Sequence, residues 1–212
     1  LNYDVPGMRE AMIADMDWWV KNTDIDGFRC DVAGFVPTDF WNTAITTLRA
    51  TNGPLFMLAE WEDPALIEAG FNAVYGWEFH HIMNEIARGH KNVSAIAEYA
   101  AKGDTLWPSE TMKMYFNTNH DENSWNGTVE ERMGDLGNAM YVLAAMMQRS
   151  FPLIYSGQEA GLNHRFPFFT KDTVGLDWST PHGRADFFSQ MLALKHKHQA
   201  LFNGELGYDM SL

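Results

Sequence analysis

Three short segments of the chain place acidic side chains directly after runs of apolar residues. The segments are "IDGFRCDVAGF", "PLFMLAEWE" and "KMYFNTNHDE", and the polar residues that they present are Arg29, Asp31, Glu60, His120 and Asp121. Each apolar run has the composition of a buried strand, and the carboxyl ends of parallel strands meet at one rim, where active sites form. A single acid at such a position is more often a cap or part of an ion pair. Three of them together predict one shared pocket.

The first segment carries a cation and an acid two residues apart. On a strand, residues i and i+2 share a face, so Arg29 and Asp31 point the same way. Burying one charge without a partner is very costly, and we therefore expect the two side chains to pair. The positive charge of Arg29 favours the ionised form of Asp31. Glu60 stands at the end of an apolar strand beside Trp61, and such apolar surroundings favour the protonated form of its carboxyl group. A charged and a protonated carboxyl are what glycoside hydrolysis requires, although a structural ion pair alone explains the first strand adequately.

Other chemistries find less support. The chain has no GxGxxG, GxxxxGK[ST] or HExxH motif and no cysteine pair, and the serine of "YSGQEAG" does not fit a nucleophile elbow. A carboxylate cluster could hold Mg²⁺, but Arg29 would compete with the cation. The absence of a glycine-rich first turn disfavours a phosphate-binding domain. Aromatic side chains that either stack on sugar faces or pack in the core are Trp61, Trp77, Trp125 and Tyr75.

Apolar periodicity predicts helices that alternate with strands. Strands are expected over residues 25–32, 54–60, 70–76, 112–121 and 151–157, and helices over 6–22, 38–50, 77–88, 93–101, 136–149 and 185–201, with a short helix after Pro64. This alternation indicates an α/β domain with a parallel sheet. About five strands allow either a doubly wound sheet or the later part of a (β/α)8 barrel, which needs eight strands and typically about 250 residues. No linker or repeat stands out, so residues 1–212 are interpreted as a single domain.

The net charge and the hydropathy of the chain disfavour several classes of binding partner. The formal net charge of −13 disfavours nucleic acid and anionic membrane surfaces, because both attract basic proteins. No apolar run approaches the ~20 residues of a membrane span. A single cysteine, Cys30, excludes an intrachain disulfide, which suits a reducing compartment and large exported enzymes equally well.

The ordered set of motifs strongly resembles the α-amylase family of glycoside hydrolases (family 13). "GFRCDVA" is similar to the family's strand-4 motif, "FMLAEWE" to its strand-5 motif, "FNTNHDE" to its strand-7 motif and "FPLIYSGQEAGL" to its strand-8 segment, with "KDTVGLDW" similar to the loop that follows. The resemblance covers essentially the whole chain. It implies a partial (β/α)8 TIM barrel, from about strand 4 to strand 8.

The resemblance also implies roles for individual residues. Asp31 is the expected nucleophile, Glu60 the general acid/base and Asp121 the third catalytic acid, which holds sugar hydroxyls. Arg29 is expected to orient Asp31, and His120 to donate to a sugar hydroxyl. Trp61 is assigned to substrate binding as an aromatic side chain at the rim. Retention of configuration through a glycosyl-enzyme places the Asp31 and Glu60 carboxyls about 5–5.5 Å apart.

The implied activity is retaining hydrolysis of α-1,4-glucosidic bonds in starch-like glucans, as in α-amylases. Cyclomaltodextrinases, neopullulanases and transglycosylases of the family use the same acids and remain alternatives. A non-catalytic glucan-binding module is the alternative outside enzymes, but it would have no need for an acid/base.

Two departures from the family pattern bear on what the chain binds and does. The family's strand-3 motif, Asp-x-x-x-Asn-His, is absent, so we expect the chain to be a piece of a longer parent protein. We expect this piece alone to have weak catalytic activity or none. Its open strand edges could allow it to self-associate. Gly34 and Phe35 stand where calcium-binding members often have Lys-His, so calcium is not expected at the usual position, and no other cofactor or metal is indicated. An extracytoplasmic location is favoured for the parent.

Overall fold

The computed structural model describes residues 1–175 and 183–201 of the chain, in two compact units. The first unit comprises Leu1–Tyr75 and Asp104–Lys113, and the second comprises Gly76–Gly103 and Met114–Leu212. Among the described residues, none of the helices combines the length and the hydropathy that a bilayer crossing requires.

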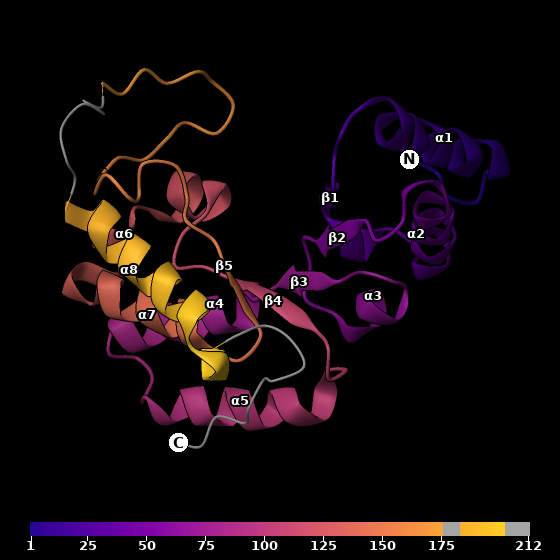
Figure 1. Ribbon diagram of the computed structural model, residues 1–212. Helices are drawn as coiled ribbons and strands as arrows, with labels where there is room; N and C mark the ends of the chain where they lie inside the picture. Colours follow the sequence, from indigo (N-terminus) through magenta and orange to yellow (C-terminus); the bar gives the residue numbers. More distant parts are fainter. Residues whose placement is uncertain (176–182, 202–212) are drawn as a thin grey trace. The chain divides into compact units, whose positions relative to one another are not determined.

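The first unit alternates helices with three parallel strands (Figure 1). In chain order its elements are α1 (Pro6–Asn22), β1 (Gly27–Cys30), the 3-10 turn η1 (Ala33–Phe35), α2 (Thr38–Asn52), β2 (Phe56–Ala59), α3 (Pro64–Glu68) and β3 (Ala73–Tyr75). Strand β2 pairs with β1 on one side and with β3 on the other, both in parallel. The register sets Cys30 opposite Ala59, so that the residues after β1 and β2 emerge side by side.

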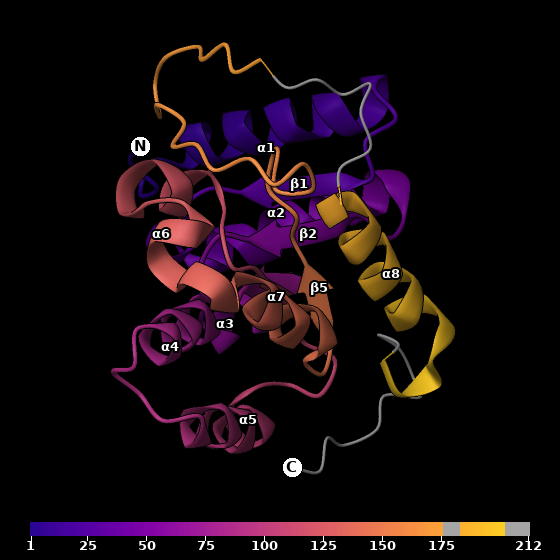
Figure 2. The same ribbon diagram turned by 90° about the vertical axis from the view of Figure 1, so that its left-hand side faces the viewer.

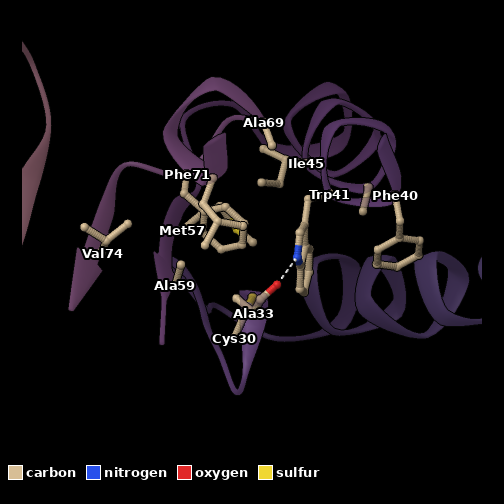
Figure 3. Packing of buried hydrophobic residues seen from close by; sticks show 12 residues of the cluster. Cys30, Ala33, Phe40, Trp41, Ile45, Met57, Ala59, Ala69, Phe71 and Val74 are labelled. Atoms are coloured by element: carbon tan, nitrogen blue, oxygen red, sulfur yellow. Dashed lines mark hydrogen bonds between the residues drawn. The ribbon is translucent and has the colours of Figure 1, made fainter. Parts of the chain in front are cut away.

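The core of this unit lies between the strands and α2 (Figure 3). Met57 and Ala59 of β2 are fully buried and face the apolar side of α2, where Phe40, Trp41 and Ile45 are buried. The Trp41 indole donates a hydrogen bond to the carbonyl of Ala33, the first residue of η1, at 3.0 Å. That bond ties the turn after β1 to the helix that covers the sheet.

The second unit holds most of the later elements. The later elements are α4 (Trp77–Ala87), α5 (Ser94–Leu106), β4 (Met112–Tyr115), the π-helical turn η2 (Glu122–Asn126), α6 (Val129–Met133), η3 (Gly134–Leu136), α7 (Gly137–Met146), β5 (Ser150–Pro152), α8 (Gly183–Lys197) and η4 (Gln199–Leu201). The end of α5 and the start of β4 belong to the first unit. Helices α7 and α8 lie side by side (Figure 2). Their contact includes a perpendicular ring pair, Tyr141 and Phe188, at 4.4 Å. The end of the "KDTVGLDW" segment lies outside the described residues.

The observed elements confirm the expected alternation of strands and helices and correct three details. The strand expected over 151–157 is only Ser150–Pro152. The strand expected over 112–121 is only Met112–Tyr115, because His120 and Asp121 already have helical backbone in front of η2. Helix α6 was not expected from the sequence, although Thr128 and Glu131 form a complete capping box at its start.

Gly27 provides a test of the β1–β2 pairing. A methyl group at this position would overlap the carbonyl of Phe56, its partner across the sheet, so we expect Gly27→Ala to lower the free energy of unfolding by about 1–3 kcal/mol. Gly7→Ala is the matched control, because nothing lies within 4 Å of its added methyl group and alanine favours the helix α1. Urea denaturation of both variants measures the difference. Equal stabilities would contradict the close pairing at Gly27.

Candidate active site

The candidate site of the first unit begins where β1 ends. Asp31 is the first residue after the strand, and Val32 follows it in the left-handed region, with φ 47° and ψ 41°. A β-branched residue is strained in this conformation, typically by about 1–2 kcal/mol. The Val32 N–H donates to Glu60 Oε2 at 2.6 Å, and this bond holds the strained turn against the end of β2.

A single guanidinium group joins the ends of all three strands. Arg29 Nη1 lies 2.5 Å from Asp31 Oδ1, and Nη2 lies 3.2 Å from Glu60 Oε1. Its Nε donates to the hydroxyl of Tyr75, the last residue of β3, at 3.1 Å. The expected pair of Arg29 with Asp31 is confirmed, and Glu60 shares the same cation.

The two carboxylates differ in exposure. The Asp31 side chain is 70% exposed, whereas that of Glu60 is 15% exposed. Asp31 is therefore open to a ligand, whereas the Glu60 side chain is mostly covered by protein. Contrary to the apolar surroundings expected for Glu60, its side chain accepts an amide N–H and contacts a cation.

The neighbouring groups of β1 stay in their ordinary protonation states. Burial lowers the pKa of Arg29, but its hydrogen bonds to Tyr75 and Asp31 and the charge of Glu60 outweigh burial and raise the pKa above its usual value. Burial raises the pKa of the Cys30 thiol to about 12, against the opposing charge of Arg29. The guanidinium is permanently charged, and the thiol is not a nucleophile near neutral pH.

Trp61 lies directly after Glu60 and is half-buried against the core of the first unit. Its ring centroid is 4.9 Å from that of Phe35, which is 76% exposed. The indole lies against Gly34 so closely that a methyl group there would overlap it. Gly34 therefore sets the position of Trp61, and the two rings form an aromatic surface beside the strand ends.

His120 and Asp121 lie together in the second unit. Asp121 precedes η2 with helical backbone, and His120 Nε2 is 3.5 Å from Asp121 Oδ2. Both side chains reach solvent, with 45% and 28% of their surface exposed. Burial raises the pKa of the nearby Tyr155 hydroxyl, and the charge of Asp121 raises it further. The structure thus forms two groups: Arg29, Asp31, Glu60 and Trp61 in the first unit, and His120 and Asp121 in the second.

A buried polar network includes residues on either side of the second group in the chain, and it was not expected from the sequence. His80 of α4 is fully buried, with Nδ1 3.1 Å from the carbonyl of Phe116 and Nε2 3.0 Å from Glu122 Oε2. Arg132 of α6 is 4% exposed and donates to the carbonyl of Asn117 at 2.7 Å. Its other two hydrogen bonds, to the Gly127 carbonyl and to Asn84 Oδ1, measure 2.9 Å and 2.8 Å.

Electrostatics favour an ionised Glu122 within this network. Burial raises the pKa of Glu122, but the His80 hydrogen bond and the Arg132 charge outweigh it and hold the pKa below its ordinary value. The network fixes the backbone on both sides of Asp121, because it binds Asn117 before it and Glu122 after it. The sequence feature that could have indicated this buried network is Glu122, the charged residue directly after "NHD".

Metal binding finds no support in the geometry of the described residues. Nowhere in 1–175 or 183–201 do three or more His, Cys, Asp or Glu side chains converge as metal ligands.

Comparison with known proteins finds similar sequences and similar solved structures. The chain is 25% identical over 217 residues to a cyclomaltodextrinase from a Bacillus species, covering 96% of this chain and 38% of that protein. It superposes on a noncanonic maltogenic α-amylase from Thermotoga neapolitana with a TM-score of 0.78 and 28% identity, over 96% of this chain and 47% of the other. An α-amylase from Lactobacillus plantarum gives a TM-score of 0.79 at 24% identity, over 96% and 50%.

The chain therefore spans less than half the length of this curated relative and about half of these solved structures. No family model matches the sequence. The superposition on half of each solved chain confirms the expected partial barrel.

The buried network predicts a large difference between two arginines that each face a glutamate. Arg132→Met leaves buried acceptors and Glu122 without their cation, so we expect a loss of about 3–5 kcal/mol in unfolding free energy. Arg88→Met is the control, because Arg88 is 44% exposed and lies 3.4 Å from Glu85. Such surface ion pairs contribute about 0–1 kcal/mol to the free energy of unfolding. Chemical denaturation compares the two, and similar losses would show that the network is not what stabilises this unit.

Proposed function

We propose that the chain belongs to the α-amylase family of glycoside hydrolases, as part of its catalytic barrel, and that it supplies the acids with which a longer enzyme cleaves α-glucosidic bonds. The observation that supports this proposal most directly is the Arg29 guanidinium, which holds Asp31 and Glu60 together at the ends of adjacent strands. Glycoside hydrolysis with retention requires two neighbouring carboxyl groups in different protonation states.

In the proposed reaction, Asp31 attacks the anomeric carbon of the bound glucose unit while Glu60 protonates the departing glycosidic oxygen. The bond from the anomeric carbon to that oxygen breaks, and a covalent glycosyl-enzyme forms on Asp31. Glu60, now ionised, then removes a proton from water, which attacks the anomeric carbon and releases Asp31. The exposed Asp31 suits the attack, because its carboxylate is open to a ligand.

One cation shared by two carboxyls supports their different protonation states. If both were ionised, their combined charge of −2 would face a single guanidinium, so retaining one proton on the pair is favourable. Burial disfavours charge, and Glu60 is the more buried of the two, so we assign the proton to Glu60 when a glucan excludes water from the site.

The remaining site residues are proposed as substrate contacts. His120 and Asp121 contact the hydroxyls of the sugar that is cleaved, in keeping with their partial exposure. Trp61 and the exposed Phe35 beside it present apolar surface to sugar rings. Because the proposed mechanism retains configuration, it predicts that the carboxyl groups of Asp31 and Glu60 lie about 5–5.5 Å apart.

The preferred substrate is proposed from the relatives. The curated relative is named a cyclomaltodextrinase, which favours cyclic maltodextrins over starch, and the solved structure with 28% identity is named a maltogenic α-amylase. Starch hydrolysis of the α-amylase type is the second candidate, supported by the solved α-amylase of similar fold. Product analysis of the full-length enzyme on cyclodextrin, pullulan and starch separates the two.

Substitution of the two central acids tests the proposed reaction. In the full-length enzyme, we expect Glu60→Gln to lower kcat on an α-glucan by about 10²–10⁴-fold, and Asp31→Asn at least as much, since each removes one chemical step. Asp24→Asn and Glu10→Gln are matched controls on exposed residues and should keep full activity. Full activity of both Asp31 and Glu60 variants would falsify the assignment.

Tyr75 offers a finer test of how Arg29 is held. Tyr75→Phe removes the acceptor of the Arg29 Nε hydrogen bond without changing the ring, so we expect kcat to fall by about 10-fold with little change in KM. Tyr141→Phe is the control, because the Tyr141 hydroxyl is buried with no hydrogen-bond partner among the described residues. A kcat for Tyr75→Phe equal to that of the control would show that Arg29 needs no support from β3.

A further inference from the structure

Three aromatic side chains of the second unit lie in contact with one another at the surface. Trp125 is 60% exposed, Phe168 is 39% exposed and Phe169 is 84% exposed. The ring centroids are 5.2 Å apart for Trp125 and Phe168, 4.8 Å for Phe168 and Phe169, and 6.2 Å for Trp125 and Phe169. Exposed apolar side chains that lie in contact with one another, rather than singly, are typical of ligand-binding surfaces.

The rings are held in place by a tethered loop. His164 Nε2 lies 2.6 Å from Asp172 Oδ2, so the segment that carries Phe168 and Phe169 is closed at its base. Asn123 of η2 is 6% exposed; it donates to the His164 carbonyl at 2.9 Å and accepts from the Phe166 N–H at 2.8 Å. The side chain that anchors the loop therefore comes from the same π-helical turn as Trp125.

The aromatic cluster adjoins the residues proposed to contact sugar. The His120 ring stacks on that of Phe168, with centroids 5.9 Å apart. Trp125 lies four residues after Asp121, within the turn that Asp121 precedes. A ligand held by His120 and Asp121 that extends beyond one sugar would reach these rings.

We propose that Trp125, Phe168 and Phe169 form a subsite for further α-linked glucose units of the substrate. This inference rests on the proposed function. A pyranose ring presents C–H groups on its faces and hydroxyls at its edges, so its faces pack on aromatic rings while the hydroxyls stay in water. The ligand is neutral, which suits a protein of net charge −13 that would repel anions. The subsite selects longer glucans over short ones.

Chain-length dependence tests the subsite in the full-length enzyme. For Trp125→Ala, we expect kcat/KM on maltoheptaose to fall about 10-fold and that on the shortest maltooligosaccharide cleaved to change less than about 2-fold, since only the longer ligand reaches the rings. Trp125→Phe keeps a stacking ring and should retain most of the preference. Trp18→Ala is the matched control, because Trp18 is a similarly exposed tryptophan on α1.

The outcomes separate the subsite from the proposed function. If the wild type cleaves maltoheptaose and Trp125→Ala and Phe169→Ala match it at every chain length, the subsite is refuted and the proposed function stands. If the wild type neither binds maltoheptaose in calorimetry nor cleaves any α-glucan, the proposed function fails, and the subsite fails with it. A selective loss on the longer substrate supports both.

Discussion

The arrangement of acidic side chains in the first unit depends on one shared cation, the guanidinium of Arg29. Two carboxylates at the ends of adjacent parallel strands repel each other, and Arg29 offsets that repulsion by contacting both. The contact exists because the register places Cys30 opposite Ala59, so that Asp31 and Glu60 follow at the same level. A slip by one residue would turn one acid to the other face of the sheet. The packing of small and apolar residues between β1, β2 and α2 thus determines where the charges meet.

In the second unit, charged side chains are also paired, but there they are buried. Glu122 and Arg132 are almost completely removed from water, which is costly for charged groups unless each is paired. The buried His80 lies beside them, and burial lowers the pKa of its imidazole. Their hydrogen bonds reach the backbone on both sides of the "NHD" segment, so the exposed pair His120 and Asp121 stands on a rigid base. For the proposed sugar contacts of His120 and Asp121, such a base would reduce the reorganisation required when a ligand binds.

The sequence predicted the order of helices and strands and the pairing at the end of β1, because both follow from local periodicity and charge spacing. It could not predict which distant groups meet there. Tyr75 reads as an ordinary strand aromatic, yet its hydroxyl anchors Arg29 from β3. Arg132 lies in an unremarkable charged run, and its burial depends on how α6 packs. The apolar neighbours of Glu60 suggested a dry site, whereas the structure supplies an N–H donor from the turn after β1.

The strained turn at Val32 links the two acids through the backbone as well as through the guanidinium. Its left-handed conformation is held by the N–H bond to Glu60, so a side chain at position 60 without an acceptor would let the turn relax. Relaxation would shift Asp31, which is the preceding residue. The changes in unfolding free energy caused by truncating the side chains at positions 31 and 60 should therefore not be additive. A double-mutant cycle between the two positions would measure this coupling through the backbone, together with any direct interaction of the side chains.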